Sequence, residues 1–288
     1  MSVDIVRVGV VGAGTMGNGI AQVFASAGHP VAMRDIKPEF VDRGMATIAR
    51  NLDRLVTREK MTAADREAAL SRIRPTTAME DLADCDIVVE AIVEKFEVKS
   101  SVIKQLDELC RPQTIIATNT SSISVTRIAS TSKLPNRVIG MHFFNPVPMM
   151  QLVEIIRALQ TSDEVCDSVV KLSQSIGKKA RVSKDSYGFV VNRVLIPMIN
   201  EAINCVYEGL ASTDDVDAMM KLGANHPMGP LSLADLIGLD IVLDIMETLY
   251  QGFDDPKYRP SPLLKQMCDA GYLGRKAGRG FFNYEVQH

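Results

Sequence analysis

Short apolar runs alternate with amphipathic segments along the first two-thirds of the chain. β-Branched and aliphatic runs predict strands near residues 6–11, 31–33, 87–90, 115–118, 138–141 and 152–156. Apolar positions at helical spacing predict helices over about 17–27 and 97–109, each between two of these strands. Because strands and helices alternate, we expect an α/β fold built on a doubly wound parallel sheet.

Two segments depart from this alternation. Residues 38–72 have the pattern of two successive helices that meet near 60–62, where Thr62 is a suitable helix start. This helical hairpin is long for a crossover between strands and is expected to protrude. Beyond residue 186 the strand patterns stop, and helices are predicted over 190–208, 213–222 and 231–250. We therefore expect a sheet domain over 1–186 and an all-helical domain over 187–288.

The composition is that of a globular protein large enough for more than one core. Of the 288 residues, 46% are hydrophobic and 23% are charged. The net charge of −3, the absence of tryptophan and the 5% aromatic content argue against a nucleic-acid partner. The five cysteines are scattered without metal-ligand spacing, so we expect free thiols and no metal site.

The chain shows no signal for a membrane or for export. No apolar run approaches the roughly 18–20 residues of a membrane-spanning helix. A strand pattern that begins at Val6 leaves no room for a signal peptide. A cytoplasmic protein fits these observations, and a processed organellar protein would fit them equally.

A glycine-rich turn stands between the first strand and the first helix, and Asp35 ends the next strand. This order is typical of the Rossmann dinucleotide-binding fold. Gly12 would permit the tight turn, Gly14 the approach of a pyrophosphate, and Gly17 close packing of the helix. The turn, which we expect to bind the cofactor, reads Gly12-Ala13-Gly14-Thr15-Met16-Gly17.

Asp35 also predicts which dinucleotide binds. A carboxylate at this position accepts hydrogen bonds from the adenosine ribose and repels a 2′-phosphate, so we expect NAD rather than NADP. Arg34 and Lys37 are nearby cations that could reach a phosphate, which keeps NADP as the alternative.

One of the four histidines, His142, follows a strand of the predicted sheet, and Glu154 comes twelve residues later. A polar run over 118–122 follows the preceding strand. Ligands of open α/β sheets bind outside the carboxyl ends of the strands. An imidazole oriented by a carboxylate is a common device for proton transfer near neutral pH. A lone histidine is more often a core residue, but these polar neighbours favour a catalytic role for His142.

Taken together, the motifs resemble those of the L-3-hydroxyacyl-CoA dehydrogenase family, most closely its bacterial 3-hydroxybutyryl-CoA members. The resemblance covers nearly the whole chain and includes the glycine turn, the His142 segment with Glu154, and residues 119–122, 188–193 and 225–230. It implies NAD-dependent oxidation of an (S)-3-hydroxyacyl-CoA to a 3-oxoacyl-CoA. It also implies a homodimer that forms through the helical domain.

The resemblance assigns roles to individual residues. His142 is expected to be the general base for the 3-hydroxyl proton, and Glu154 is expected to orient it. Ser121 and Asn192 are expected to hold the reacting oxygens of the acyl group. Further cofactor-side residues are Glu94, Lys99, Ser121, Asn145 and Lys276, and further substrate-side residues are Asn145, Asn51 and Arg58. At the last two positions relatives usually carry serine and lysine, which contact the CoA 3′-phosphate.

Two other functions remain open from the sequence. A dehydrogenase of a free hydroxy acid could share the two-domain design, but it gives no account of the His142–Glu154 segment. A non-catalytic, crystallin-like relative could share the fold, but the retained polar positions argue against it. Within the resemblance, the short format favours 3-hydroxybutyryl-CoA and acetoacetyl-CoA as the reacting pair.

Overall fold

The computed structural model describes residues 5–284, and the chain divides into two compact units between Ser186 and Tyr187. Each unit has its own apolar core. The first unit is an α/β domain and the second is helical, so the predicted fold class is confirmed.

The first unit is built on a sheet whose strands lie in the order β3-β2-β1-β4-β5-β6-β7-β8. Its strands are β1 (Val8–Val11), β2 (Val31–Arg34), β3 (Ile73–Thr76), β4 (Ile87–Glu90), β5 (Ile115–Thr118), β6 (Val138–Phe143), β7 (Leu152–Arg157) and β8 (Lys179–Lys184). The sequence pattern misses β3 and β8. These are the two edge strands, where proline and exposed charged residues replace the apolar run of a central strand.

The sheet is parallel, as expected, except at one position. β7 pairs with β6 in the antiparallel direction, whereas every other neighbouring pair is parallel. The physical reason is the length of the connection, residues 144–151, which is shorter than the dozen or so residues that a parallel crossover needs. The reversal matters for function because it sets β6 and β7 side by side as a hairpin.

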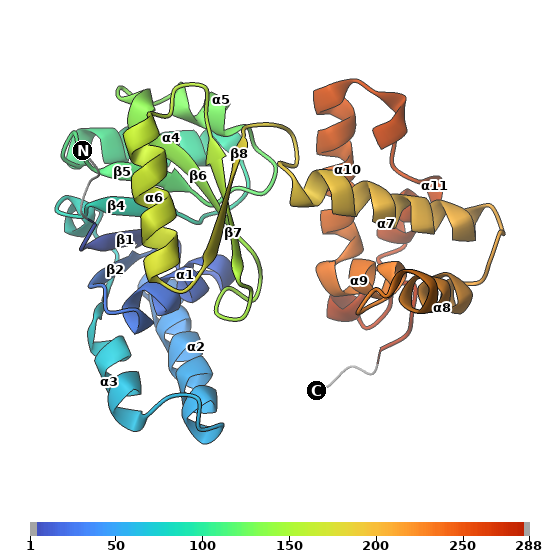
Figure 1. Cartoon of the computed structure of the whole chain (residues 1–288), viewed down its shortest axis with the longest axis horizontal. Coiled ribbons are helices and arrows are strands. Elements are labelled where there is room, and N and C mark those ends of the chain that lie inside the picture. Colours follow the sequence, from blue (N-terminus) through green and yellow to red (C-terminus); the bar gives the residue numbers. More distant parts are fainter. Residues whose placement is uncertain (1–4, 285–288) are drawn as a thin grey trace. The chain divides into compact units, whose positions relative to one another are not determined.

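Helices cover both faces of the sheet (Figure 1). α1 (Thr15–Ser26) and α6 (Asp163–Ser175) pack with the sheet in one apolar core, while α4 (Phe96–Leu109) and α5 (Val125–Ala129) lie on the other face. The carboxyl ends of β1, β4, β5 and β6 meet at one edge of the sheet, since these strands are parallel. That edge is the expected place for a ligand crevice.

The helical hairpin consists of α2 (Pro38–Thr57) and α3 (Ala63–Ser71), which extend away from the sheet (Figure 1). Thr62 caps α3, and its hydroxyl accepts the Asp65 N–H at 3.0 Å, as its position before the helix predicted. The apolar stripe of α2 includes Val41, Ile48 and Leu52, which are buried in the core of the first unit.

The second unit consists mainly of helices around a separate core. They are α7 (Val191–Tyr207), α8 (Thr213–Ala224), α9 (Pro230–Ile237), α10 (Leu239–Phe253) and α11 (Pro262–Asp269). The prediction of one helix over 231–250 is wrong, because the chain breaks at Gly238, whose φ of 105° lies outside the helical range. The sequence analysis also missed α11. Within residues 5–284 no helix is long and apolar enough to span a bilayer.

Candidate functional site

The glycine turn has the geometry that a dinucleotide requires. Gly12 has φ of 106°, and a Cβ there would lie 2.5 Å from the Ala91 carbonyl oxygen. A Cβ on Gly17 would lie 1.7 Å from the Gly12 carbonyl oxygen, so the start of α1 packs directly on the turn. A Cβ on Gly14, by contrast, would meet nothing within 4 Å. The turn is therefore tight at its two ends and open in the middle, where a phosphate can approach backbone N–H groups.

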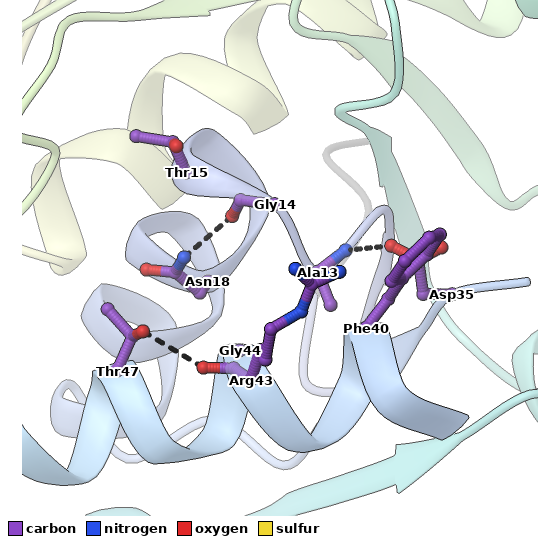
Figure 2. Close-up of a pocket in the computed structure, with 9 residues that line it drawn as sticks. All are labelled: Ala13, Gly14, Thr15, Asn18, Asp35, Phe40, Arg43, Gly44 and Thr47. Carbon is purple, nitrogen blue, oxygen red and sulfur yellow. Dashed lines mark hydrogen bonds between the residues drawn. The ribbon is translucent and has the colours of Figure 1, made fainter. Parts of the chain in front are cut away.

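A cavity of about 380 Å³ opens beside this turn (Figure 2). Asp35 lies at its edge, and its carboxylate is fixed by two backbone donors, Ala13 N–H and Ile36 N–H, each at 2.7 Å. The lining comprises Ala13, Gly14, Thr15, Asn18, Asp35, Phe40, Arg43, Gly44 and Thr47. A carboxylate oxygen has two lone pairs, so Asp35 can accept a ribose hydroxyl while it holds the turn.

Phe40 and Arg43 belong to this cavity, and the sequence analysis did not identify them. Figure 2 shows both side chains rising from α2 towards Asp35 and the glycine turn. The Arg43 guanidinium lies 4.8 Å from the centre of the Phe40 ring. The sequence signal for them is indirect and consists of Gly44 on the same helix. Because Gly44 has no side chain, α2 can pack closely on the turn, where a Cβ would lie 2.8 Å from the Ala13 carbonyl oxygen.

A second cavity of about 200 Å³ contains the two asparagines expected to contact substrate. Asn51 reaches it from α2, and Asn145 reaches it from the segment after β6. Its other lining residues are Thr15, Asn18, Gly19, Thr47, Pro146, Val147 and Pro148. Thr15, Asn18 and Thr47 also line the first cavity, so the two spaces adjoin. Arg58, at the end of α2, is not part of either lining and is exposed.

His142 and Glu154 are brought together by the β6–β7 hairpin. They are paired residues in the antiparallel register, which is why a spacing of twelve residues places their side chains face to face. His142 Nδ1 lies 2.8 Å from Glu154 Oε2, and the two side chains are only 5% and 4% exposed. An ionised carboxylate only accepts hydrogen bonds, so opposite an ionised Glu154 it is the Nδ1–H group that donates this bond. In the neutral ring Nε2 is then the basic nitrogen.

The turn after β5, residues 119–122, is organised by Glu94. The Oε1 atom of Glu94 accepts hydrogen bonds from Thr120 Oγ1 at 2.5 Å, Ser121 N–H at 2.8 Å and Ser122 N–H at 3.0 Å. Desolvation opposes ionisation of Glu94, but the charge of Lys99 and these hydrogen bonds outweigh it and lower its pKa. Glu94 therefore holds the backbone that presents Ser121. The same edge is tied to β6, since Phe143 N–H donates to Asn119 Oδ1 at 2.9 Å.

Lys99 lies behind Glu94 rather than on the surface of the site. Its side chain is 0% exposed, and its Nζ lies 2.8 Å from Glu90 Oε1 and 3.3 Å from Glu94 Oε2. Glu90 is equally buried and also accepts the Thr118 hydroxyl at 2.7 Å. The structure thus places Lys99 where it supports Glu94, and it leaves the lysine no exposed surface with which to touch a ligand directly.

Two of the expected site residues, Asn192 and Lys276, lie in the second unit. Asn192 is buried in the first turn of α7. Lys276 is in the basic segment after α11, where its Nζ pairs with both oxygens of Asp240 at 2.6 and 2.5 Å. The segment that follows is anchored by Asp235, which accepts Phe281 N–H and Phe282 N–H at 3.0 Å each.

Comparison with known proteins gives matches over both units. The family model of the 3-hydroxyacyl-CoA dehydrogenase NAD-binding domain matches residues 7–186, and that of the 3-hydroxyacyl-CoA dehydrogenase C-terminal domain matches residues 188–284. The chain is 54% identical over 278 residues to a probable 3-hydroxybutyryl-CoA dehydrogenase of Deinococcus radiodurans, covering 96% of this chain and 100% of the relative. It is 52% identical to a 3-hydroxybutyryl-CoA dehydrogenase of Clostridioides difficile, covering 96% and 99%.

The fold matches a solved structure equally well. The crystal structure of (S)-3-hydroxybutyryl-CoA dehydrogenase PaaH1 from Ralstonia eutropha superposes with a TM-score of 0.96. The two sequences are 54% identical, and the match covers 98% of this chain and 100% of the other. The similarity therefore extends over both units and is not confined to the dinucleotide-binding half.

Proposed function

The chain belongs to the 3-hydroxyacyl-CoA dehydrogenase family and is an NAD-dependent oxidoreductase, and from this premise we propose that its substrate is (S)-3-hydroxybutyryl-CoA. The product of oxidation is acetoacetyl-CoA. The single observation that carries the proposed chemistry is the buried His142–Glu154 pair, which lies at the end of a strand of the nucleotide-binding sheet. Such a pair is suited to removing a hydroxyl proton.

The residues present fit NAD. The open middle of the glycine turn at Gly14 leaves space for the pyrophosphate, and the N-terminus of α1 favours its charge. Asp35 would accept the adenosine ribose hydroxyls and disfavour a 2′-phosphate. Phe40 and Arg43 would border the adenosine half in the first cavity. When bound, NAD supplies the acceptor for the hydride that leaves C3 of the substrate.

His142 is proposed as the general base of the reaction. Its Nδ1–H is engaged by Glu154, so Nε2 would take the proton of the 3-hydroxyl as the C3 hydride departs. The carboxylate opposite would stabilise the imidazolium that forms, and burial of both groups strengthens that stabilisation. The reverse reaction returns the same proton to the oxygen of the 3-oxo group.

The remaining polar residues are proposed to hold the substrate. Ser121 and Asn192 would bind the reacting oxygens, and Asn145 would position the substrate beside the cofactor. Asn51 would contact the CoA portion in the second cavity, which it shares with Asn145. Arg58 would bind the 3′-phosphate at the exposed end of α2, where a guanidinium can pair with two phosphate oxygens.

Assembly and location are part of the proposal. We propose a homodimer that forms through the helical unit, which presents exposed apolar side chains such as Leu210, Met219 and Leu222. We further propose a cytoplasmic enzyme. Sedimentation at micromolar concentration tests the first statement, and a monomer at that concentration would contradict it.

The proposed reaction is tested by following NADH formation spectrophotometrically. The substrates are (S)-3-hydroxyacyl-CoA thioesters of increasing chain length and, as the matched control, free 3-hydroxybutyrate. We expect turnover of the thioesters, highest kcat/KM with the four-carbon one, and preference for NAD over NADP. Turnover of the free acid alone would favour a hydroxy-acid dehydrogenase, and inertness towards all substrates would favour a non-catalytic relative.

A further inference from the structure

A buried lysine lies beneath the segment that follows His142. Lys178, between α6 and β8, is only 7% exposed. Its Nζ donates hydrogen bonds to the carbonyl oxygens of Val147 at 2.6 Å and Met150 at 2.7 Å. Desolvation lowers the pKa of Lys178. A buried ammonium is costly unless its donors are satisfied, and here backbone carbonyls of one short loop satisfy two of them.

That loop, residues 145–150, forms one wall of the second cavity. Asn145, Pro146, Val147 and Pro148 all line the space that Asn51 faces from α2. The loop also has internal support, because Met149 N–H and Met150 N–H both donate to the Pro146 carbonyl at 3.0 Å. It carries Asn145, which the proposed function places beside the substrate.

The loop is held from the opposite side by α1. Val147 is 2% exposed, and a Cβ on Gly19 would lie 2.8 Å from Val147 Cβ. The absence of a side chain on Gly19 is what allows this close approach. The 145–150 loop thus lies between Gly19 of α1 and the ammonium of Lys178, and it is in close contact with α1.

We propose that Lys178 is a positioning residue, which holds the 145–150 loop against α1 and so sets the geometry of the acyl-CoA side of the second cavity. The inference rests on the proposed function, which assigns Asn145 and Asn51 to the substrate. Lys178 itself is separated from the cavity by the loop that it holds, because it contacts the backbone carbonyls and is absent from the lining. Its effect on the reaction is therefore transmitted through the loop.

The decisive variant is Lys178→Met, which keeps most of the apolar stem and removes the ammonium. The backbone carbonyls of Val147 and Met150 then lose their donor, and the loop is expected to move to regain solvent or other partners. Displacements of about 1 Å at a site can cost roughly 100-fold in rate. We expect kcat/KM for the acyl-CoA to fall about 10- to 100-fold. The Kd for NAD should change less than kcat/KM does, because Asn145 is on the loop whereas Gly14 and Asp35 line the other cavity.

Lys179→Met is the matched control. Lys179 is the next residue and is exposed, and its backbone N–H donates to the Gln151 carbonyl at 2.8 Å, a bond that a change of side chain leaves in place. The control removes one lysine charge at nearly the same place and leaves both loop carbonyls bonded to Lys178. It should keep kcat/KM within about twofold of the unaltered enzyme, since exposed substitutions have small effects.

Two readouts and one conservative variant separate positioning from general destabilisation. Hydrogen exchange of the 145–151 peptide should rise in Lys178→Met while exchange in the core strands stays unchanged. In a double-mutant cycle, Lys178→Met and Asn145→Ala should be strongly non-additive, because both act through one loop. Lys178→Arg, which keeps the charge and donors, should recover most of the lost kcat/KM.

Three results would overturn the inference: unchanged kcat/KM in Lys178→Met, unchanged exchange over 145–151, or additive effects with Asn145→Ala. If Lys178→Met does not fold, Lys178→Gln, which removes the charge and shortens the reach towards the two carbonyls, is judged by the same three criteria. Failure of the proposed function has a different signature, since the unaltered enzyme would then be inactive with acyl-CoA. The exchange measurement would still decide the role of Lys178 in that case.

Discussion

Replacing Glu154 by glutamine tests the electrostatic half of the proposed mechanism. Glutamine keeps the shape and can still accept the His142 Nδ1–H bond, which now spans 2.8 Å, but it removes the negative charge. The centres of the two charges in the imidazolium–carboxylate pair are roughly 4 Å apart. Their Coulomb attraction is then about 4 kcal/mol at an effective dielectric constant of about 20. Both side chains are at most 5% exposed, so solvent screening is small.

The rate effect follows from the fraction of this energy that the transition state uses. If the imidazolium is half to fully formed, the loss is about 2–4 kcal/mol, or roughly 30- to 1000-fold in kcat. The assay is steady-state NADH formation at saturating substrates, together with an NAD titration, which should be unchanged. Glu108→Gln is the matched control, because Glu108 forms an exposed ion pair with Lys133 at 3.5 Å, and it should behave as the unaltered enzyme. A Glu154→Gln variant with nearly full kcat would refute the reasoning.

Two further predictions concern the cofactor edge of the sheet. Gly14→Ala should unfold at nearly the same temperature as the unaltered enzyme but bind NAD at least about tenfold more weakly. Gly17→Ala should lose about 1–3 kcal/mol of stability, because only its Cβ meets the backbone. Equal effects of the two substitutions in thermal denaturation and NAD titration would contradict this prediction. Because the pKa of Glu94 is lowered, its ionised form stabilises the fold above the ordinary carboxyl range, and this contribution is lost as pH falls through the lowered pKa. The difference in unfolding free energy between the unaltered enzyme and Glu94→Gln, measured in urea, should therefore shrink from pH 7 to pH 3, and a constant difference would argue against the role of Glu94.

The dinucleotide half could be predicted from the sequence because its signals are local. Strand, glycine turn and helix are adjacent in the chain, and a Cβ at Gly12 or Gly17 would clash with the backbone. The helical start at Thr62 is equally local. By contrast, the break at Gly238 was missed because the apolar helical spacing continues from α9 into α10, and one glycine inside such a pattern is usually tolerated.

Most supporting contacts of the site could not be predicted, because they join distant segments. The pairing of His142 with Glu154 was expected, but the antiparallel register of β6 and β7 that produces it is not specified by a pattern of two short apolar strands. Lys99 matched a cofactor-side position in the resemblance, yet its contacts with Glu90 and Glu94 bury it completely. The bonds from Lys178 to the 145–150 loop span about thirty residues and have no sequence signature.

The central claim is that His142 is the general base of an NAD-dependent 3-hydroxyacyl-CoA dehydrogenase. The most direct test is single-turnover NADH formation by His142→Gln, mixed with NAD and (S)-3-hydroxybutyryl-CoA, with NAD affinity measured on the same preparation. The account predicts NAD affinity within about twofold of the unaltered enzyme and a chemical step slowed about 10²- to 10⁴-fold, the usual contribution of a general base. Nearly full-speed NADH formation by this variant would contradict it.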